Sequence, residues 1–213
     1  MFAASKLLTS AFFNRDPRRV ARGLLGKLLV RKTPRGILAG RIVETEAYLG
    51  NDDAAAHSAV GKTARNAVLF GPPGHAYVYF IYGAHFCLNV SCLPDGVAGG
   101  VLFRALEPVA GIEQMVAARG VDFAHDADLQ KVSILKKISS GPGRLAEALG
   151  VTRERDNEKS FVSARSDLRI VEDGYRVRRI IVTPRIGIVK AAEEPLRYLI
   201  AGNAFVSGRK FCR

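Results

Sequence analysis

The sequence predicts a single α+β domain over residues 1–213, with a curved, largely antiparallel β-sheet, a projecting β-hairpin and peripheral helices. Three observations predict this fold class. Short apolar and aromatic runs recur along the chain, and each is bounded by Gly, Pro or other turn residues. Several of these runs are only a few residues apart, which is typical of antiparallel hairpins. The 213 residues are 48% hydrophobic and 24% charged, which is enough for a buried core and excludes disorder over most of the length.

The first part of the chain predicts one helix, one hairpin and a long loop. Asp16-Pro17 is typical of a helix start, because a capping carboxylate precedes a proline, and the apolar residues of 20–25 form one helical face. Residues 28–32 and 37–48 read as two strands joined by a turn that contains Pro and Gly. Residues 50–75 contain six Gly and Pro residues, which argue against a long helix there.

The remainder predicts more strands and two short helices. A dense apolar and aromatic block reads as strands at 77–82 and 85–92, which meet in a hairpin at Gly83. Residues 120–138 have no clear pattern. The other expected elements are helices at 112–119 and 144–149, and strands at 100–106, 168–171, 178–182 and 196–200.

The charge balance predicts a polyanionic partner. The chain has 32 Lys and Arg against 20 Asp and Glu, a net charge of +12. The excess is uneven, with +8 over residues 1–40, −3 over 41–118 and +6 over 151–213. We expect the basic flanks to hold phosphates; a basic surface that serves only solubility is the alternative.

Several other classes of protein are excluded. The three cysteines form no CxxC pair, so neither a disulfide framework nor a four-cysteine zinc site is expected. No run approaches the roughly 20 apolar residues that span a bilayer, and the N-terminus lacks the pattern of a cleaved signal. We therefore expect no membrane contact and a cytoplasmic location, associated with the nucleoid if the source is bacterial. The phosphate-loop, HExxH and GxSxG motifs do not occur.

Two carboxylates and an aromatic ring fall on one face of the strand expected at 37–48. Alternation along a strand places Glu44, Glu46 and Tyr48 together. Such a group at the end of a strand suits acid/base chemistry beside a stacking wall, and a solvated strand face is the alternative. His57 follows in the loop, where it is either part of this site or an ordinary surface residue.

The aromatic strand at 77–82 has a second notable pattern. Alternation places Tyr77 and Tyr79 on one face and Tyr82 on the other, next to the hairpin glycine. Rings that stack on bases, with one ring at a projecting tip, suit a protein that unstacks nucleic acid. The alternative is an aromatic core.

Two polar side chains lie inside apolar strands. Asn89 and Arg104 need partners there, since burying either group unpaired costs several kcal/mol. An ion pair of Arg104 with Glu44 or Glu46 satisfies this need, and the same groups could form a polar pocket.

These segments resemble a known family, the alkyladenine (3-methyladenine) DNA glycosylases. The blocks occur in the family's order and cover about residues 9–207. The two most specific are ETEAY and YVYFIYG. The blocks that carry the resemblance are RIVETEAYLG (41–50), AAAHS (54–58), RN (65–66), GHAYVYFIYGAHFCLN (74–89), VLFRALEP (101–108), SGPGRL (140–145) and PLRYLIAGNAFVS (195–207).

The resemblance implies a monofunctional enzyme, monomeric and without a metal or other cofactor, that acts on double-stranded DNA containing damaged purines. Such an enzyme flips the purine out of the duplex and hydrolyses its N-glycosidic bond. Glu46 would activate water and stabilise the oxocarbenium-like sugar. Arg104 and the backbone carbonyl of Ile186 would help to orient that water.

The resemblance also assigns the binding residues. Tyr48, His57 and Tyr79 would form the walls of the base pocket, Asn89 would select against the exocyclic amino group of guanine, and Tyr82 would fill the gap left by the flipped nucleotide. Contacts to the DNA backbone would come from Lys62, Thr63, Arg65 and Gly187.

Two other functions fit part of the pattern. A catalytically silent nucleic-acid-binding module would use the basic flanks and the aromatic hairpin, with Glu46 as a structural residue. An enzyme acting on free nucleosides would use the pocket, but neither the net charge of +12 nor Tyr82 suits it.

Overall fold

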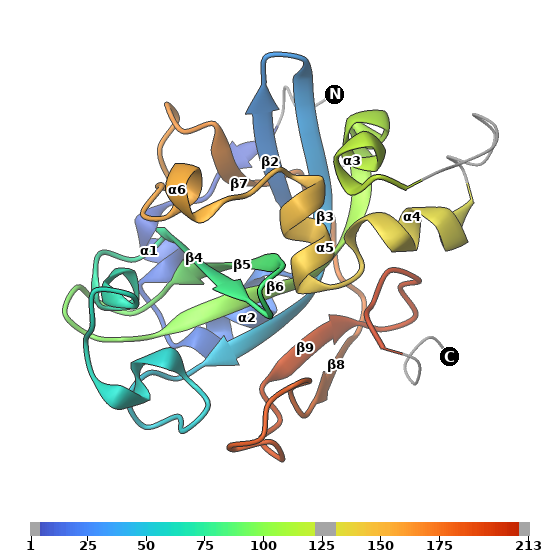
Figure 1. Ribbon diagram of the computed structural model, residues 1–213. Coiled ribbons are helices and arrows are strands. Elements are labelled where there is room, and N and C mark those ends of the chain that lie inside the picture. Colours follow the sequence, from blue (N-terminus) through green and yellow to red (C-terminus); the bar gives the residue numbers. More distant parts are fainter. Residues whose placement is uncertain (1–4, 122–130, 209–213) are drawn as a thin grey trace.

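The protein is described by a computed structural model over residues 5–121 and 131–208 (Figure 1). It contains one antiparallel sheet in the order β1-β7-β2-β3-β6-β5-β4, in which β9 also pairs with β3, and β8 pairs with β9. The strands are β1 (Lys6–Leu7), β2 (Leu28–Thr33), β3 (Gly36–Tyr48), β4 (Ala76–Ile81), β5 (His85–Ser91), β6 (Gly100–Ala110), β7 (Leu168–Glu172), β8 (Ile180–Thr183) and β9 (Arg197–Ile200). The helices are α1 (Ser10–Phe13), α2 (Pro17–Leu24), α3 (Ile112–Arg119), α4 (Val132–Ser139), α5 (Pro142–Ala148) and α6 (Arg153–Asp156), with 3-10 turns η1 (His57–Val60) and η2 (Ala67–Phe70).

Strand β3 is the centre of the sheet. One of its edges pairs with β6, while the other pairs first with β2 and then, over residues 44–46, with β9. Helix α2 begins as expected, because the Asp16 carboxylate accepts a hydrogen bond from the Arg18 N–H and proline follows at the first position. The Thr45 hydroxyl donates to the Ala21 carbonyl at 3.0 Å, so α2 covers one face of β3. Alternation turns the residues on either side of Thr45 to the opposite face.

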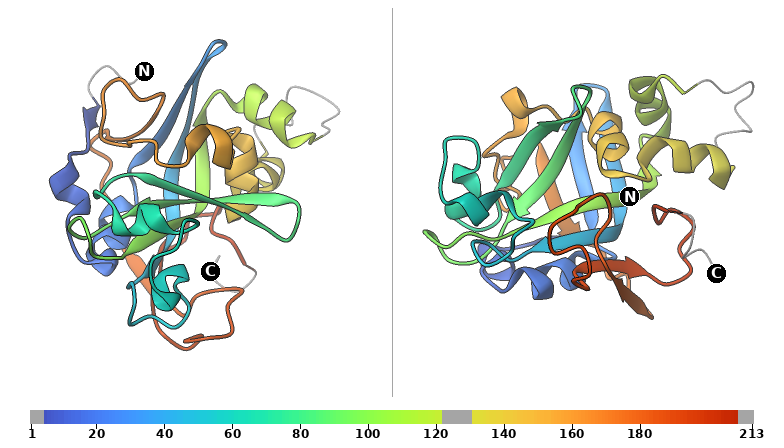
Figure 2. Two further views of the ribbon diagram at one scale, coloured as in Figure 1. Left: turned by 60° about the vertical axis from the view of Figure 1, so that its left-hand side comes forward. Right: turned by 60° about the horizontal axis from the view of Figure 1, so that its bottom comes forward.

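The β4–β5 hairpin extends from the sheet past helix α5 (Figure 2). Ile81 pairs with His85, so three residues form the turn, and Tyr82 and Gly83 have left-handed φ values of 54° and 66°. The hairpin lies close to α5. A Cβ placed on Gly143 would lie 3.0 Å from the His85 side chain, so glycine allows the hairpin and α5 to approach closely.

The predicted α+β class, the antiparallel sheet and the hairpin at Gly83 are confirmed. The short elements β1, α1 and α6 were not predicted, because two to four residues carry too little periodicity to be recognised. Helix α4 lies in the stretch 120–138 that had no clear pattern, and residues 122–130 of that stretch are outside the described part of the chain.

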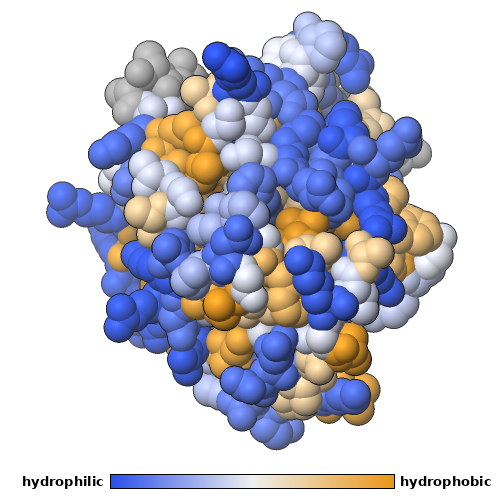
Figure 3. All heavy atoms as spheres, turned by 90° about the vertical axis from the view of Figure 1, so that its left-hand side faces the viewer, coloured by the Kyte–Doolittle hydropathy of each residue, from blue (hydrophilic) through white to orange (hydrophobic). Residues whose placement is uncertain are grey.

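The cysteines, the helix lengths and the surface complete the description of the fold. Cys87 and Cys92 are buried free thiols. Helices long and apolar enough to cross a bilayer do not occur within residues 5–121 and 131–208. The face of the molecule that lies on the left-hand side of Figure 1 is mainly hydrophilic, with apolar patches between the polar side chains (Figure 3).

Candidate active site

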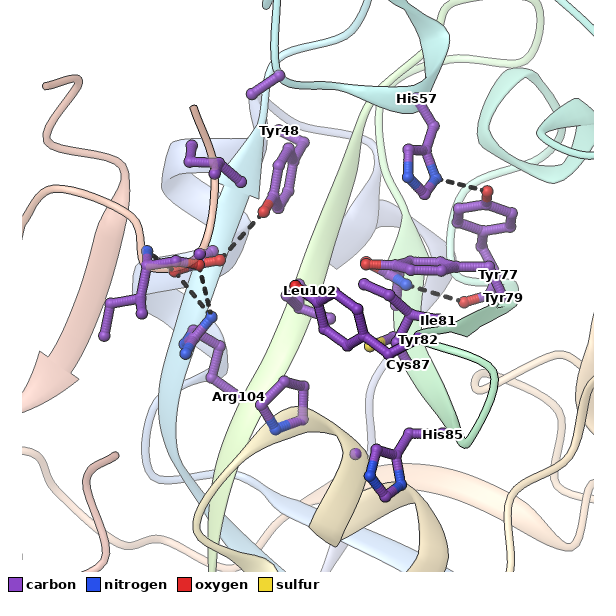
Figure 4. Close-up of a pocket in the computed structure, with 18 of the residues that line it drawn as sticks. Tyr48, His57, Tyr77, Tyr79, Ile81, Tyr82, His85, Cys87, Leu102 and Arg104 are labelled. Atoms are coloured by element: carbon purple, nitrogen blue, oxygen red, sulfur yellow. Dashed lines mark hydrogen bonds and ion pairs between the residues drawn. The ribbon is translucent and has the colours of Figure 1, made fainter. Parts of the chain in front are cut away.

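A cavity of about 420 Å³ lies between the end of β3, the β4–β5 hairpin and the loop that follows β8. Tyr48 lies on one side of it, and His57 and Tyr79 lie on the opposite side (Figure 4). Most of the predicted site residues line this cavity, namely Glu46, Tyr48, His57, Tyr79, Tyr82, Asn89, Arg104, Ile186 and Gly187. Tertiary contacts therefore bring together residues that are up to 141 positions apart in the sequence (46 to 187).

Glu46 is fully buried and has an ordered set of partners. Its Oε1 accepts a hydrogen bond from the Ile186 backbone N–H at 2.8 Å and lies 3.1 Å from Arg104 Nη1. Its Oε2 accepts from the Tyr48 hydroxyl at 3.1 Å. A buried carboxylate with one oxygen fixed by a cation and an amide is held in one orientation at the cavity wall.

Glu44 has a different environment, although it shares the face with Glu46 as predicted. Its Oε1 is bound by Arg104 Nε at 2.9 Å, Arg197 Nε at 2.6 Å and the Ser207 hydroxyl at 2.8 Å. Its Oε2 accepts from the Ser207 N–H at 2.6 Å. Arg104 therefore pairs with both carboxylates, and the alternative of a solvated strand face is wrong, because both side chains have 0% exposure.

An irregularity in the β3–β6 ladder directs Arg104 toward the site. The pairing runs from Ile42–Leu106 to Glu44–Ala105 and then to Thr45–Phe103, so that Val43 and Arg104 are skipped. Such bulges redirect side chains and are common beside active sites. Burial opposes the charge of Arg104, but Glu46 and Glu44 outweigh it and raise the pKa, so the guanidinium stays cationic.

The aromatic wall opposite Tyr48 is a hydrogen-bonded group. His57 Nδ1 lies 2.7 Å from the Tyr77 hydroxyl, and the His57 ring meets the Tyr79 ring edge-on at 4.5 Å between centroids. Burial and the charge of Arg65 lower the pKa of His57, so its imidazole is neutral at pH 7. Burial raises the pKa of Tyr48 and of Tyr79, so both hydroxyls stay protonated.

The orientation predicted for Tyr82 is wrong. Alternation placed it on the face opposite Tyr79, but Tyr82 lines the same cavity. The reason is that β4 ends at Ile81, and the left-handed φ of Tyr82 breaks the alternation. Its side chain is 81% exposed, as a hairpin-tip position requires.

The buried side chain of Asn89 has a hydrogen-bond partner, as a buried amide requires. Its side-chain amide donates to the Tyr77 carbonyl at 3.1 Å, so the amide is fixed against the cavity. Tyr77 itself lines the cavity and was not predicted as a site residue, although its alternation with Tyr79 is the signal that indicates it.

The loop predicted to contact DNA lies outside the cavity lining. Lys62, Thr63 and Arg65 are exposed, and the loop is held by Asn66, which bonds the Thr63 N–H and the carbonyls of His57 and Gly61. The Arg65 guanidinium lies 5.9 Å from the Tyr79 ring centre, which places one cation beside the aromatic wall.

The expectation that the basic flanks are free to hold phosphates is wrong for three arginines. Arg31, Arg185 and Arg197 are buried in ion pairs with Asp156, Asp53 and Glu44, respectively. These partners are separated by 125, 132 and 153 positions. A single sequence contains no local signal for such pairs, which is why Asp53, Arg185, Arg197 and Ser207 were not predicted as residues that support the site.

The sequence matches the methylpurine-DNA glycosylase (MPG) family over residues 11–204. A relative from Koribacter versatilis is 67% identical over 204 residues, which are 96% of this chain and 94% of the relative. Relatives from Burkholderia cenocepacia and Methanocella arvoryzae are 47% and 46% identical, over 95% and 90% of this chain and 91% and 89% of their own lengths. Each is provisionally named a 3-methyladenine DNA glycosylase. The chain therefore belongs to the methylpurine-DNA glycosylase family and is a DNA N-glycosylase.

Proposed function

We propose that the protein flips alkylated or deaminated purines, of the 3-methyladenine, hypoxanthine and ethenoadenine class, out of duplex DNA. It then hydrolyses the N-glycosidic bond with a water that Glu46 activates, and so starts base excision repair. The observation that carries this proposal is the buried Glu46 carboxylate at the wall of an aromatic-lined cavity. A nucleotide inside the base stack cannot reach a buried carboxylate, which supports flipping.

The surroundings of the two carboxylates support Glu46 as the base. Both oxygens of Glu44 are bound by arginine and Ser207 groups, and Glu44 is outside the cavity lining among the described residues. Glu46 lines the cavity; its Oε1 is fixed by Arg104 and Ile186, while Oε2 accepts a hydrogen bond from the Tyr48 hydroxyl alone among the described side chains. In the proposed step, Glu46 accepts a proton from water, the hydroxide oxygen bonds to C1′, and the purine leaves with the electron pair of the glycosidic bond.

The aromatic walls support selection of damaged purines. Tyr48 on one side and Tyr79 on the other can sandwich a planar base, and electron-poor or cationic alkylated purines gain most from such stacking. The neutral state of His57 suits a cationic base, because a protonated imidazole would repel it. Asn89, which lines the cavity and donates to the Tyr77 carbonyl, is the residue proposed to select against the amino group of guanine.

The exposed ring at the hairpin tip supports a role for Tyr82 in holding the duplex open. A ring inserted between base pairs replaces the stacking that the flipped nucleotide loses. Lys62, Thr63, Arg65 and Gly187 are the proposed backbone contacts around the opening.

The decisive experiment replaces Glu46 by its isosteric amide. Glu46→Gln is expected to abolish release of hypoxanthine and 3-methyladenine from duplex DNA under single-turnover conditions, because an amide cannot accept the proton from water. Binding to duplex DNA with an abasic site is expected to persist. The matched control is Glu113→Gln on the exposed surface of α3, which should excise at the wild-type rate. Near-native excision by Glu46→Gln would show that Glu46 is not the base.

A further inference from the structure

A buried ion pair, Asp53–Arg185, joins the loop after β3 to the loop after β8. Arg185 Nη1 lies 2.5 Å from Asp53 Oδ2, and Nη2 lies 2.8 Å from Oδ1, so the pair is bidentate. Both side chains are almost fully buried, with 0% and 2% exposure. Burial opposes both charges, but the hydrogen bonds lower the pKa of Asp53 and raise that of Arg185, so the pair stays ionised.

Arg185 also packs against the ring of Tyr48. Its guanidinium carbon lies 4.7 Å from the ring centroid, within the range of a cation–π contact. Tyr48 lines the cavity, whereas Arg185 is outside the lining among the described residues, so the cation contacts the ring away from the cavity. Arg185 Nη1 donates in addition to the Ala47 carbonyl at 3.1 Å, which fixes the guanidinium to the strand that carries Tyr48.

The residue after Arg185 reaches the reacting centre. The Ile186 N–H donates to Glu46 Oε1 at 2.8 Å, and residues 186–188 line the cavity. Arg185 Nη2 is 3.4 Å from the Ala191 carbonyl, so the same side chain holds both ends of this short segment. The Arg185 guanidinium therefore contacts the Tyr48 ring on the side away from the cavity. It also holds the segment whose Ile186 N–H orients Glu46.

We propose that Arg185, held by Asp53, is a positioning residue that sets the geometry of Tyr48 and Ile186 for excision. This inference rests on the proposed function of Glu46. The pair links two loops at the pocket, where displacement by about 1 Å can cost about 100-fold in rate.

A second buried pair in the same molecule provides a matched control. Arg31 and Asp156 form a bidentate pair at 2.8 Å with 1% and 0% exposure, and they join β2 to α6. Neither residue is part of the cavity lining within the described chain. Loss of this pair should therefore affect folding stability alone.

The experiment compares Arg185→Met, Arg185→Lys, Asp53→Asn/Arg185→Met and Arg31→Met. Single-turnover excision of hypoxanthine, the Kd for abasic-site duplex and the free energy of unfolding in urea are measured for each. Arg185→Met is expected to excise about 10- to 100-fold more slowly with an unchanged Kd. The double variant should regain stability, since no buried charge is left unpaired, but should not regain the rate. Arg185→Lys should fall between Arg185→Met and the wild type, because an ammonium keeps the charge without the bidentate geometry.

Arg31→Met should lose stability and keep the wild-type rate at a temperature where it is folded. A double variant that regains rate together with stability, or a wild-type rate in Arg185→Met, would overturn the positioning role. Glu46→Gln measured in parallel separates the two proposals. An inactive Glu46→Gln beside a fully active Arg185→Met contradicts only the positioning role, while an active Glu46→Gln contradicts the proposed function.

Discussion

At the residue scale, Glu44 and Glu46 are two positions apart on one strand face and have different tasks. Glu44 is bound by two arginines and by Ser207, which ties β3 to β6, to β9 and to the C-terminal segment. Glu46 has fewer partners and lines the cavity, and its Oε2 accepts a hydrogen bond from Tyr48. Identical side chains thus differ in role because of the partners that the fold places around them.

This difference predicts that the two amide substitutions lower the free energy of unfolding by different amounts. Glu44→Gln is expected to lower the free energy of unfolding by about 3–5 kcal/mol, because it leaves buried arginine charge uncompensated. Glu46→Gln should lower it less, since its remaining oxygen can still accept from Ile186. Urea unfolding of both variants measures which one loses more free energy of unfolding. A larger loss for Glu46→Gln than for Glu44→Gln would contradict this prediction.

The lowered pKa of the Asp156 carboxyl predicts how folding stability depends on pH. Burial would raise the pKa of its carboxyl, but hydrogen bonds and charge from Arg31 and Lys159 outweigh burial and lower it from 3.8 to about 2. The folded-state pKa is below the unfolded one, so this stabilisation is present above about pH 4 and is lost as pH falls toward 2. The contribution is on the order of 2 kcal/mol. Thermal unfolding of wild type and Asp156→Asn between those values should show a shallower pH dependence in the variant.

At the scale of the element, the β4–β5 hairpin combines a rigid strand pair with a strained tip. Tyr82 has a φ of 54°, which is unfavourable for a residue with a Cβ, and its ring is exposed at the mouth of the cavity. An exposed residue with an unfavourable φ is a candidate for a functional rather than a stabilising side chain.

Tyr82→Gly is therefore expected to separate stability from function. Glycine accepts this φ, so the free energy of unfolding should stay constant or rise by up to about 1 kcal/mol. Binding to abasic-site duplex should weaken by about tenfold, since one stacked ring contributes roughly 1–3 kcal/mol. Ala84→Gly in the same turn controls for backbone flexibility and should bind like the wild type. Unchanged binding by Tyr82→Gly would exclude the stacking role.

At the scale of the whole molecule, the basic residues behind the net charge of +12 fall into two groups, those buried in ion pairs and those exposed on the surface. Part of the basic excess is internal, because Arg31, Arg185 and Arg197 stabilise buried carboxylates. Helix α2, with its exposed arginines, covers the face of β3 opposite Glu46. Near the cavity, the exposed cations of the 61–66 loop are Lys62 and Arg65.

This distribution predicts a measurable salt dependence of DNA binding. Neutralising two phosphates would give a log–log slope of about −1.8, which is roughly a tenfold loss of affinity between about 50 and 200 mM salt. Lys62→Ala/Arg65→Ala should reduce the slope by about that amount. A slope that the double variant leaves intact would assign the phosphate contacts to other cations.

The local patterns of the sequence were sufficient for the fold class and for most of the candidate site. Alternation in 37–48 grouped Glu44, Glu46 and Tyr48, and the apolar surroundings of Arg104 required the ion pair that β3 and β6 form. Alternation failed at Tyr82, because it applies only as far as the strand extends.

Periodicity and turn residues within short segments were sufficient to predict most of the longer elements, the antiparallel sheet and the chemical types available to the site. Tertiary contacts are what enclose Glu44, bring Glu46 to the cavity lining and set the Arg185 guanidinium against the Tyr48 ring. Those outcomes depend on partners more than 130 positions away, such as Arg185 for Asp53 and Ser207 for Glu44. Contacts at that separation are set by how the sheet and its loops pack, and no local pattern encodes them.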